Sequence, residues 1–119
     1  IPNSVPSINE ASFKNCNRLT SIYIPSGVTS IGEGAFTNCT SLTNINIPSG
    51  VTSIRVQAFA NCASLTRITV NATTPPILGG NVFSNTNNCP IYVPTQSVDA
   101  YKAASGWSTY ADRIQAITE

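Results

Sequence analysis

A 23-residue period runs through most of this chain and constrains its fold more than any other feature. Segments 1–23, 24–46 and 47–69 align without gaps, and each places apolar residues at the same seven positions. One of these positions holds Phe13, Phe36 and Phe59. A single unit cannot bury its own apolar side chains, so consecutive units must stack to remove them from water. The pattern predicts a solenoid in which the phenylalanines form one column.

Each unit contains the spacing Leu-x-x-Ile-x-Ile, in which alternate residues of a strand point inward. The expected parallel strands are 20–24, 43–47, 66–70 and, in a degenerate fourth unit, 91–93. The Pro-Ser-Gly segments at 25–27 and 48–50 predict turns with glycine at positive φ, each followed by a short extended arm. Small and apolar residues at helical spacing over 34–39 predict a helical or 3₁₀ turn that closes the coil.

The period ends at Pro94, so we expect a solenoid over 1–94 and a C-terminal helical cap of the same domain over 95–119. Thr95 or Ser97 can cap a helix that runs to about Ala104. Bulky residues that can cover the last coil follow at Trp107, Tyr110 and Ile114. The predicted fold is an α/β, right-handed leucine-rich-repeat solenoid with one parallel strand per coil.

The cysteines are the sharpest cluster of reactive side chains. Cys16, Cys39 and Cys62 share one position in successive coils, about 4.8 Å apart and pointing the same way. This geometry favours buried free thiols, with one disulfide bridge as the alternative, and disfavours a metal because the chain has no His. Cys89 lies outside the register beside the fourth strand, where we expect it to be buried too.

Catalysis is not expected. Without His, a Ser-His-Asp or Cys-His site cannot form. Glu10 and Glu33 share a position and could imitate a glycosidase pair, but their place on a bend favours solvated surface. Asn38 begins a glycosylation pattern, yet Asn recurs at this position in every coil, which favours side-chain hydrogen bonds to the backbone of neighbouring coils. We expect no enzyme activity, no metal and no cofactor.

Composition limits the partners. Only 9% of the residues are charged and the net charge is +1, so the broad basic field that binds nucleic acid is missing. Apolar residues are interrupted every few positions, which excludes membrane insertion. The chain opens with Ile1 rather than Met, which is typical of a processed protein or an excised segment. Its first coil has no polar cap, so we expect further coils upstream or self-association through that coil.

Outward residues of the expected strands form the surface that repeat proteins generally use for recognition. They differ from coil to coil, which fits either relaxed constraint or a binding surface for a protein or other macromolecule. The candidate residues are Ser21, Tyr23, Asn44, Asn46, Arg67, Thr69 and Tyr92.

The repeat unit IPSGVTSIGEGAFTNCTSL resembles the leucine-rich repeats of the BspA-like, or Treponema-type, family of bacterial surface and secreted proteins. The segment IYVPTQSVDAYKAASGW (91–107) is similar to the C-terminal cap of Bacteroidales members. The resemblance implies an extracellular or cell-surface, non-catalytic module that adheres to host or microbial macromolecules. The alternative is a structural spacer or stalk with no ligand of its own.

Overall fold

The computed structural model describes residues 7–8, 15, 17–22 and 24–117. These contain two parallel sheets of four strands each. The short-strand sheet consists of β1 (Ser7–Ile8), β2 (Ser30–Ile31), β4 (Ser53–Ile54) and β6 (Ile77–Leu78). The long-strand sheet consists of β3 (Asn44–Ile47), β5 (Arg67–Val70), β7 (Ile91–Val93) and β8 (Ile114–Ala116). Most of 1–23 lies outside the described residues, so self-association through the first coil stays a prediction.

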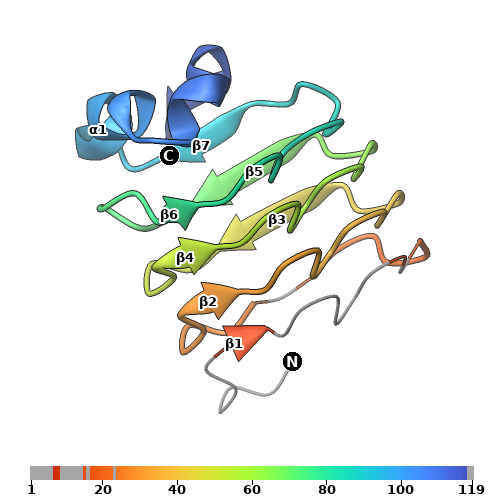
Figure 1. The fold of residues 1–119 in the computed structure, drawn as a ribbon. Helices are drawn as coiled ribbons and strands as arrows, with labels where there is room; N and C mark the ends of the chain where they lie inside the picture. The colour runs from red at the N-terminus through yellow and green to blue at the C-terminus, as the bar shows by residue number, and fades with distance from the viewer. Residues whose placement is uncertain (1–6, 9–14, 16, 23, 118–119) are drawn as a thin grey trace.

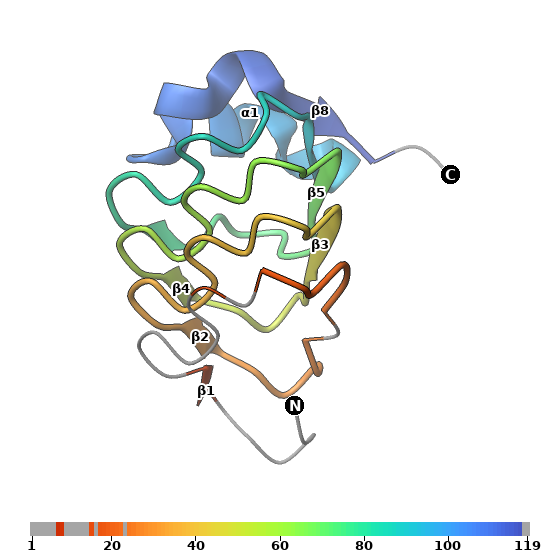
Figure 2. The same ribbon diagram turned by 90° about the vertical axis from the view of Figure 1, so that its right-hand side faces the viewer.

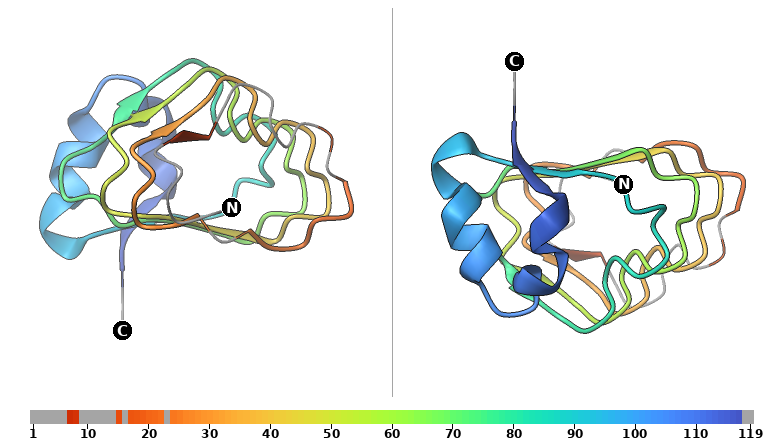
Figure 3. Two further views of the ribbon diagram at one scale, coloured as in Figure 1. Left: turned by 90° about the horizontal axis from the view of Figure 1, so that it is seen from below. Right: turned by 90° about the horizontal axis from the view of Figure 1, so that it is seen from above.

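From residue 24 to Val93, each repeat unit forms one coil that contributes a strand to both sheets. Figures 1 and 2 show the coils stacked from β1 and β2 at one end to β7 at the other, and Figure 3 shows them superposed when viewed along the stack. The register follows the period, because Ile45 pairs with Ile68 and Ile68 pairs with Ile91. The extended arm after the Pro-Ser-Gly turn therefore builds a second sheet of its own.

Identical apolar side chains lie above one another in the core. The rings of Phe36 and Phe59 are stacked with centroids 5.2 Å apart, and those of Phe59 and Phe83 with centroids 6.0 Å apart. All three residues are at most 1% exposed. The predicted column is confirmed for these coils and extends into the fourth, while Phe13 lies outside the described residues.

The strands and turns differ from expectation in three places. The described residues of 20–24 form no strand, although Thr43 N–H donates to Thr20 C=O at 3.0 Å. The next two strands begin one residue later than predicted, at Asn44 and Arg67. In the turn over 48–50, Gly50 has no positive φ, because a four-residue turn closed by Val51 N–H on Pro48 C=O at 3.2 Å does not require one.

Over 34–39, where a helical or 3₁₀ turn was expected, the structure has hydrogen-bonded turns and no helix of either kind. The chain makes successive tight turns, such as Thr37 N–H to Gly34 C=O at 3.0 Å. The intervening N–H groups donate to the next coil, with Phe36 bonded to Ala58 C=O at 2.7 Å and Asn38 to Ala60 C=O at 3.0 Å. A helix would direct all these donors along its own axis, so the turns are what allow the coils to bond to one another.

The repeated asparagine has a conformational role that the sequence analysis missed. Asn15, Asn38 and Asn61 have φ of 63°, 64° and 64°, a left-handed conformation that Asn tolerates better than most residues. The Asn38 Nδ2 donates to Asn15 Oδ1 at 2.9 Å, and Asn85 Nδ2 donates to Asn61 Oδ1 at 2.8 Å. For these residues the expected bonds to backbone are wrong, because the side chains bond to each other.

Compared with the third coil, the fourth coil has one inserted residue before Ile77 and one residue fewer just before Ile91. Ser53 pairs with Ile77 rather than with residue 76, and the shift places Thr86 above Cys62. Cys89 then falls above Leu65, and its N–H donates to Thr86 C=O as that of Leu65 donates to Cys62 C=O. Cys89 is therefore in register, at the leucine position, which corrects the expectation from the sequence.

The C-terminal segment covers the last coil (Figure 1). It consists of η1 (Thr95–Ser97), α1 (Val98–Ala103), η2 (Trp107–Arg113) and β8. Trp107 and Ile114 are buried and Tyr110 is half-buried, as expected. Ser97 occupies the N-cap position of α1, as predicted, but its side chain makes no capping bond, because its Oγ donates to Thr73 C=O at 2.7 Å.

The cap replaces the hydrogen bonds that a fifth coil would make. Its side chains donate to backbone carbonyls of the fourth coil: Tyr101 Oη to Ala72 at 2.6 Å, Trp107 Nε1 to Pro76 at 2.8 Å and Arg113 Nε to Cys89 at 2.7 Å. Strand β8 was not expected, yet Ile114 pairs with Ile91, one period earlier. The purely helical cap is thus corrected to a cap that also extends the long-strand sheet, and the boundary at residue 95 stays a proposal.

Candidate partner-binding face

The outer surface of the long-strand sheet holds the residues predicted to face a partner. Ser21, Asn44, Asn46 and Arg67 are exposed, Thr69 and Tyr92 are half-buried, and Tyr23 lies outside the described residues. Alternation along the strands explains this, because β3 buries Ile45 and Ile47 between exposed asparagines. The register places Asn44 beside Arg67, Asn46 beside Thr69, and Thr69 beside Tyr92. We call this surface the strand face.

Arg67 is the charged residue of the strand face. Its Nε donates to Thr69 Oγ1 at 3.2 Å, and its Cζ lies 4.6 Å from the centroid of the Tyr92 ring. The bond and the cation–π contact hold the guanidinium against the sheet while leaving its terminal nitrogens open. No described carboxylate forms an ion pair with Arg67.

A shallow hollow of about 460 Å³ opens beside Arg67. Its polar lining consists of Asn44, Asn46, Thr66, Arg67, Thr69 and Asn71. Asn71 was not predicted to belong to this face, but its Nδ2 donates to Asn46 Oδ1 and to Ile47 C=O at 3.0 Å. Its position directly after β5 was the signal that could have placed it on this face.

A second, smaller hollow of about 190 Å³ shares Asn46 and Asn71 with the first. Its remaining lining is mostly apolar and comes from Ile22, Ile24, Pro48 and Ser26. A charged polar hollow and an apolar hollow thus adjoin on the strand face, with an amide pair between them.

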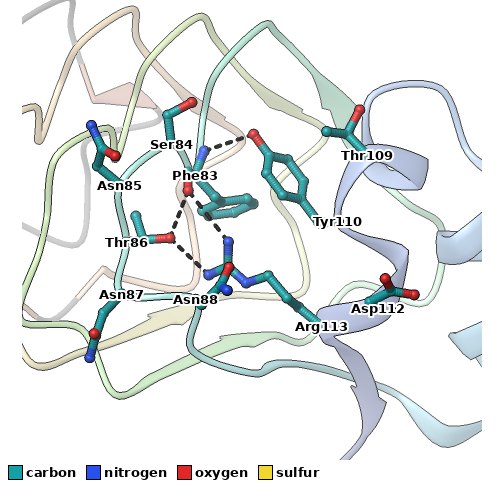
Figure 4. A pocket seen from close by; sticks show the side chains of 10 residues that line it. All are labelled: Phe83, Ser84, Asn85, Thr86, Asn87, Asn88, Thr109, Tyr110, Asp112 and Arg113. Carbon is teal, nitrogen blue, oxygen red and sulfur yellow. Dashed lines mark hydrogen bonds between the residues drawn. The ribbon is translucent and has the colours of Figure 1, made fainter.

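A third hollow, of about 830 Å³, lies between the turn over 83–88 and η2 (Figure 4). Its central groups already hold the cap to the last coil. Arg113 Nη2 donates to Thr86 Oγ1 at 2.8 Å, and Tyr110 Oη accepts from Phe83 N–H at 3.3 Å. Because these groups are committed to structural bonds, this hollow is a weaker candidate than the strand face.

The described cysteines are structural. Cys39, Cys62 and Cys89 are buried, as predicted, and Cys62 and Cys89 are free thiols, while Cys16 lies outside the described residues. The bond with the Cys39 side chain, together with burial, raises the pKa of Cys62 far above its usual range, and its Sγ lies 3.2 Å from Phe36 C=O. Burial raises the pKa of Cys89 despite the opposing effect of Arg113. Neither thiol supplies a thiolate near neutral pH.

Acidic groups form no centre in the described part of the chain. Glu33 is exposed, as predicted, and Glu10 lies outside the described residues. Among the described residues, no three His, Cys, Asp or Glu side chains gather where they could hold a metal ion. Over the same residues, no helix combines the length and apolar character needed to cross a bilayer.

Stacked coils with parallel strands, a repeated apolar column and a variable outer face define a leucine-rich-repeat interaction module with a solenoid-like α/β fold. The chain belongs to the BspA-type leucine-rich repeat family, because the model described as "BspA type Leucine rich repeat region (6 copies)" matches residues 1–103. A comparison with curated proteins returned no match. Members of this class are generally non-catalytic and mediate protein–protein interaction.

Proposed function

We propose that this chain is an extracellular adhesion module that binds a protein or other macromolecule on a host or microbial surface through its strand face. The observation that carries the proposal is Arg67, an exposed guanidinium held in place by Thr69 and Tyr92 without a carboxylate partner among the described residues. An arginine and a tyrosine that are already ordered lose little side-chain freedom on binding, and both residue types are enriched at interface anchors.

The extracellular placement rests on the family, whose members are typically surface-bound or secreted. It predicts that antibodies raised against the folded chain label intact source cells as strongly as permeabilised cells. Labelling only after permeabilisation would contradict this part of the proposal.

The strand face can be tested with two matched amide-to-lysine substitutions. Asn44→Lys adds a long charged side chain to the face, whereas Gln57→Lys makes the same change at an exposed turn after β4 in the short-strand sheet. Both variants are screened by biolayer interferometry against a panel of purified extracellular-matrix and bacterial surface proteins, with melting temperatures measured in parallel. We expect at least one partner whose affinity falls tenfold or more with Asn44→Lys and stays unchanged with Gln57→Lys.

A spacer would behave differently. If no panel member depends on Asn44, while deletion of one 23-residue coil shortens the particle without other effect, the structural role holds and the binding proposal fails.

A further inference from the structure

We propose that the hollow beside Arg67 binds the carboxylate of an acidic side chain in an extended segment of a partner protein. This inference rests on the proposed function, because it identifies the chemistry that the strand face recognises.

The guanidinium is prepared for a two-point bond. Arginine carries five N–H donors in a planar fork, and within the described residues only the Nε donor of Arg67 is used, by Thr69 Oγ1. The terminal nitrogens remain free to donate to both oxygens of one carboxylate, which is the geometry of the strongest arginine–carboxylate pairs. Stacking on Tyr92 fixes the plane of the fork before the partner arrives.

The surroundings of Arg67 favour one negative charge. The long-strand sheet contains neither Asp nor Glu, and the rest of the polar lining consists of amides and hydroxyls. The described acidic residues lie on other elements: Glu33 follows β2, Asp99 is in α1 and Asp112 is in η2. A single cation matches a single carboxylate, whereas a nucleic-acid backbone requires several cations along its length.

The second hollow extends the recognition along the chain of the partner. It adjoins the first across Asn46 and Asn71, and its lining includes the apolar side chains of Ile22 and Pro48. Side chains two apart on an extended strand point to the same side, about 6.6–7 Å from each other. An extended segment can therefore place an acidic side chain beside Arg67 and a small apolar side chain in the second hollow.

The test is a titration of ¹⁵N-labelled protein with short peptides, followed by NMR. The first peptide is acetyl-Thr-Glu-Thr-Val-Thr-amide, the second replaces its Glu with Gln, and the third replaces its Val with Ser. We expect the first peptide to shift the Arg67 Nε–H signal and the amides of β3 and β5, and to bind at least tenfold more tightly than the second. The third should bind several-fold more weakly than the first, because it leaves the apolar hollow unfilled.

Protein variants separate a specific anchor from general charge. Arg67→Ala should abolish the preference for Glu over Gln, and Arg67→Lys should lower it at least fivefold because lysine cannot form the fork. The control Arg55→Ala removes the same charge from an exposed arginine that follows β4, and it should leave the titration unchanged. Melting temperatures check that each variant is folded.

Each remaining outcome has a definite reading. Equal binding of the Glu and Gln peptides, or an equal loss with Arg55→Ala, overturns the carboxylate inference and leaves the proposed function standing. The carboxylate inference is also overturned, and the proposed function kept, if a single-stranded oligonucleotide displaces the first peptide at a concentration lower than that of the peptide. It is likewise overturned if no peptide shifts the signals of the strand face although the panel yields a partner whose affinity depends on Asn44. If the peptides and the panel both fail, the inference and the proposed function fall together.

Discussion

Phe59 is the side chain on which the stacking of the coils can be tested most directly. It is 1% exposed and lies between two parallel rings, with interplanar angles of 3° to Phe36 and 7° to Phe83. Phe59→Ala removes a ring from the middle of the column, so Phe36 and Phe83 each lose their contact with the Phe59 ring. Because backbone bonds hold the coils on both sides, the gap cannot close by simple collapse.

The expected cost follows from burial and ring contacts. Truncation of a buried phenylalanine to alanine costs about 3–5 kcal/mol, and each aromatic pair contributes about 0.5–1.5 kcal/mol beyond the buried area. With two pairs lost, we expect the upper end, about 5 kcal/mol. A domain of this size has a total stability of roughly 6–18 kcal/mol, so this variant should lose between about a quarter and about four fifths of it.

The assay is urea unfolding followed by two probes. Far-UV circular dichroism reports the sheets, and the fluorescence of Trp107, the only tryptophan, reports the cap. With a urea m-value of about 2 kcal/mol/M, the midpoint should fall by about 2.5 M. Double-mutant cycles with leucine substitutions then measure the interaction energy between pairs of rings. The adjacent pair, Phe36→Leu with Phe59→Leu, should give about 0.5–1.5 kcal/mol, and the non-adjacent pair, Phe36→Leu with Phe83→Leu, less than about 0.5 kcal/mol.

The reasoning depends on contact between adjacent coils only. Equal coupling for adjacent and non-adjacent phenylalanine pairs would refute it, and so would a cost of Phe59→Ala below about 2 kcal/mol.

Three further predictions concern the caps of the stack, its turns and its thiols. Arg113→Met leaves the Cys89 carbonyl without its donor and should cost about 2–3 kcal/mol by Trp107 fluorescence, whereas Arg55→Met, at an exposed site, should cost less than about 0.5 kcal/mol. Asn61→Ala forces an alanine into a φ of 64° and should destabilise by about 1 kcal/mol more than Asn61→Gly in urea unfolding, and equal costs would contradict the conformational role. Because the pKa of Cys62 and of Cys89 is raised in the folded state, the stability they contribute is complete below about pH 8.5 and is lost as the pH rises, by up to about 1.4 kcal/mol per pH unit and thiol. Urea unfolding at pH 7.5 and 9.5 should show this loss, Cys62→Ala should reduce it, and a pH-independent stability would count against buried neutral thiols.

The period and the apolar positions were sufficient to predict the coils, the column of phenylalanines and the buried thiols. These features depend only on which residues must leave water, and alternation with a constant repeat length reports that directly. The outward residues of β3 and β5 followed from the same alternation. Ile114 lies one period beyond Ile91, so the repeat pattern also indicated β8. The pattern is recognisable there only over the length of that one strand.

Hydrogen bonding between coils could not be predicted in the same way. Whether Phe36 N–H bonds within its own turn or to Ala58 depends on where the next coil lies, and a local pattern contains no such information. The same is true of Ser97, which reaches the preceding coil instead of capping its helix.

The binding face shows this division most clearly. Residue types and spacing placed Arg67 and Tyr92 on the outer surface of their strands, but the contact between them joins different coils. Likewise, the side chain of Asn71 bonds to that of Asn46 only because the chain, after one full coil, returns to a position beside the preceding strand. Which residues are buried follows from the order of apolar and polar residues along the sequence. Which polar groups pair depends on how neighbouring coils are aligned, and that alignment exists only once the coils are stacked.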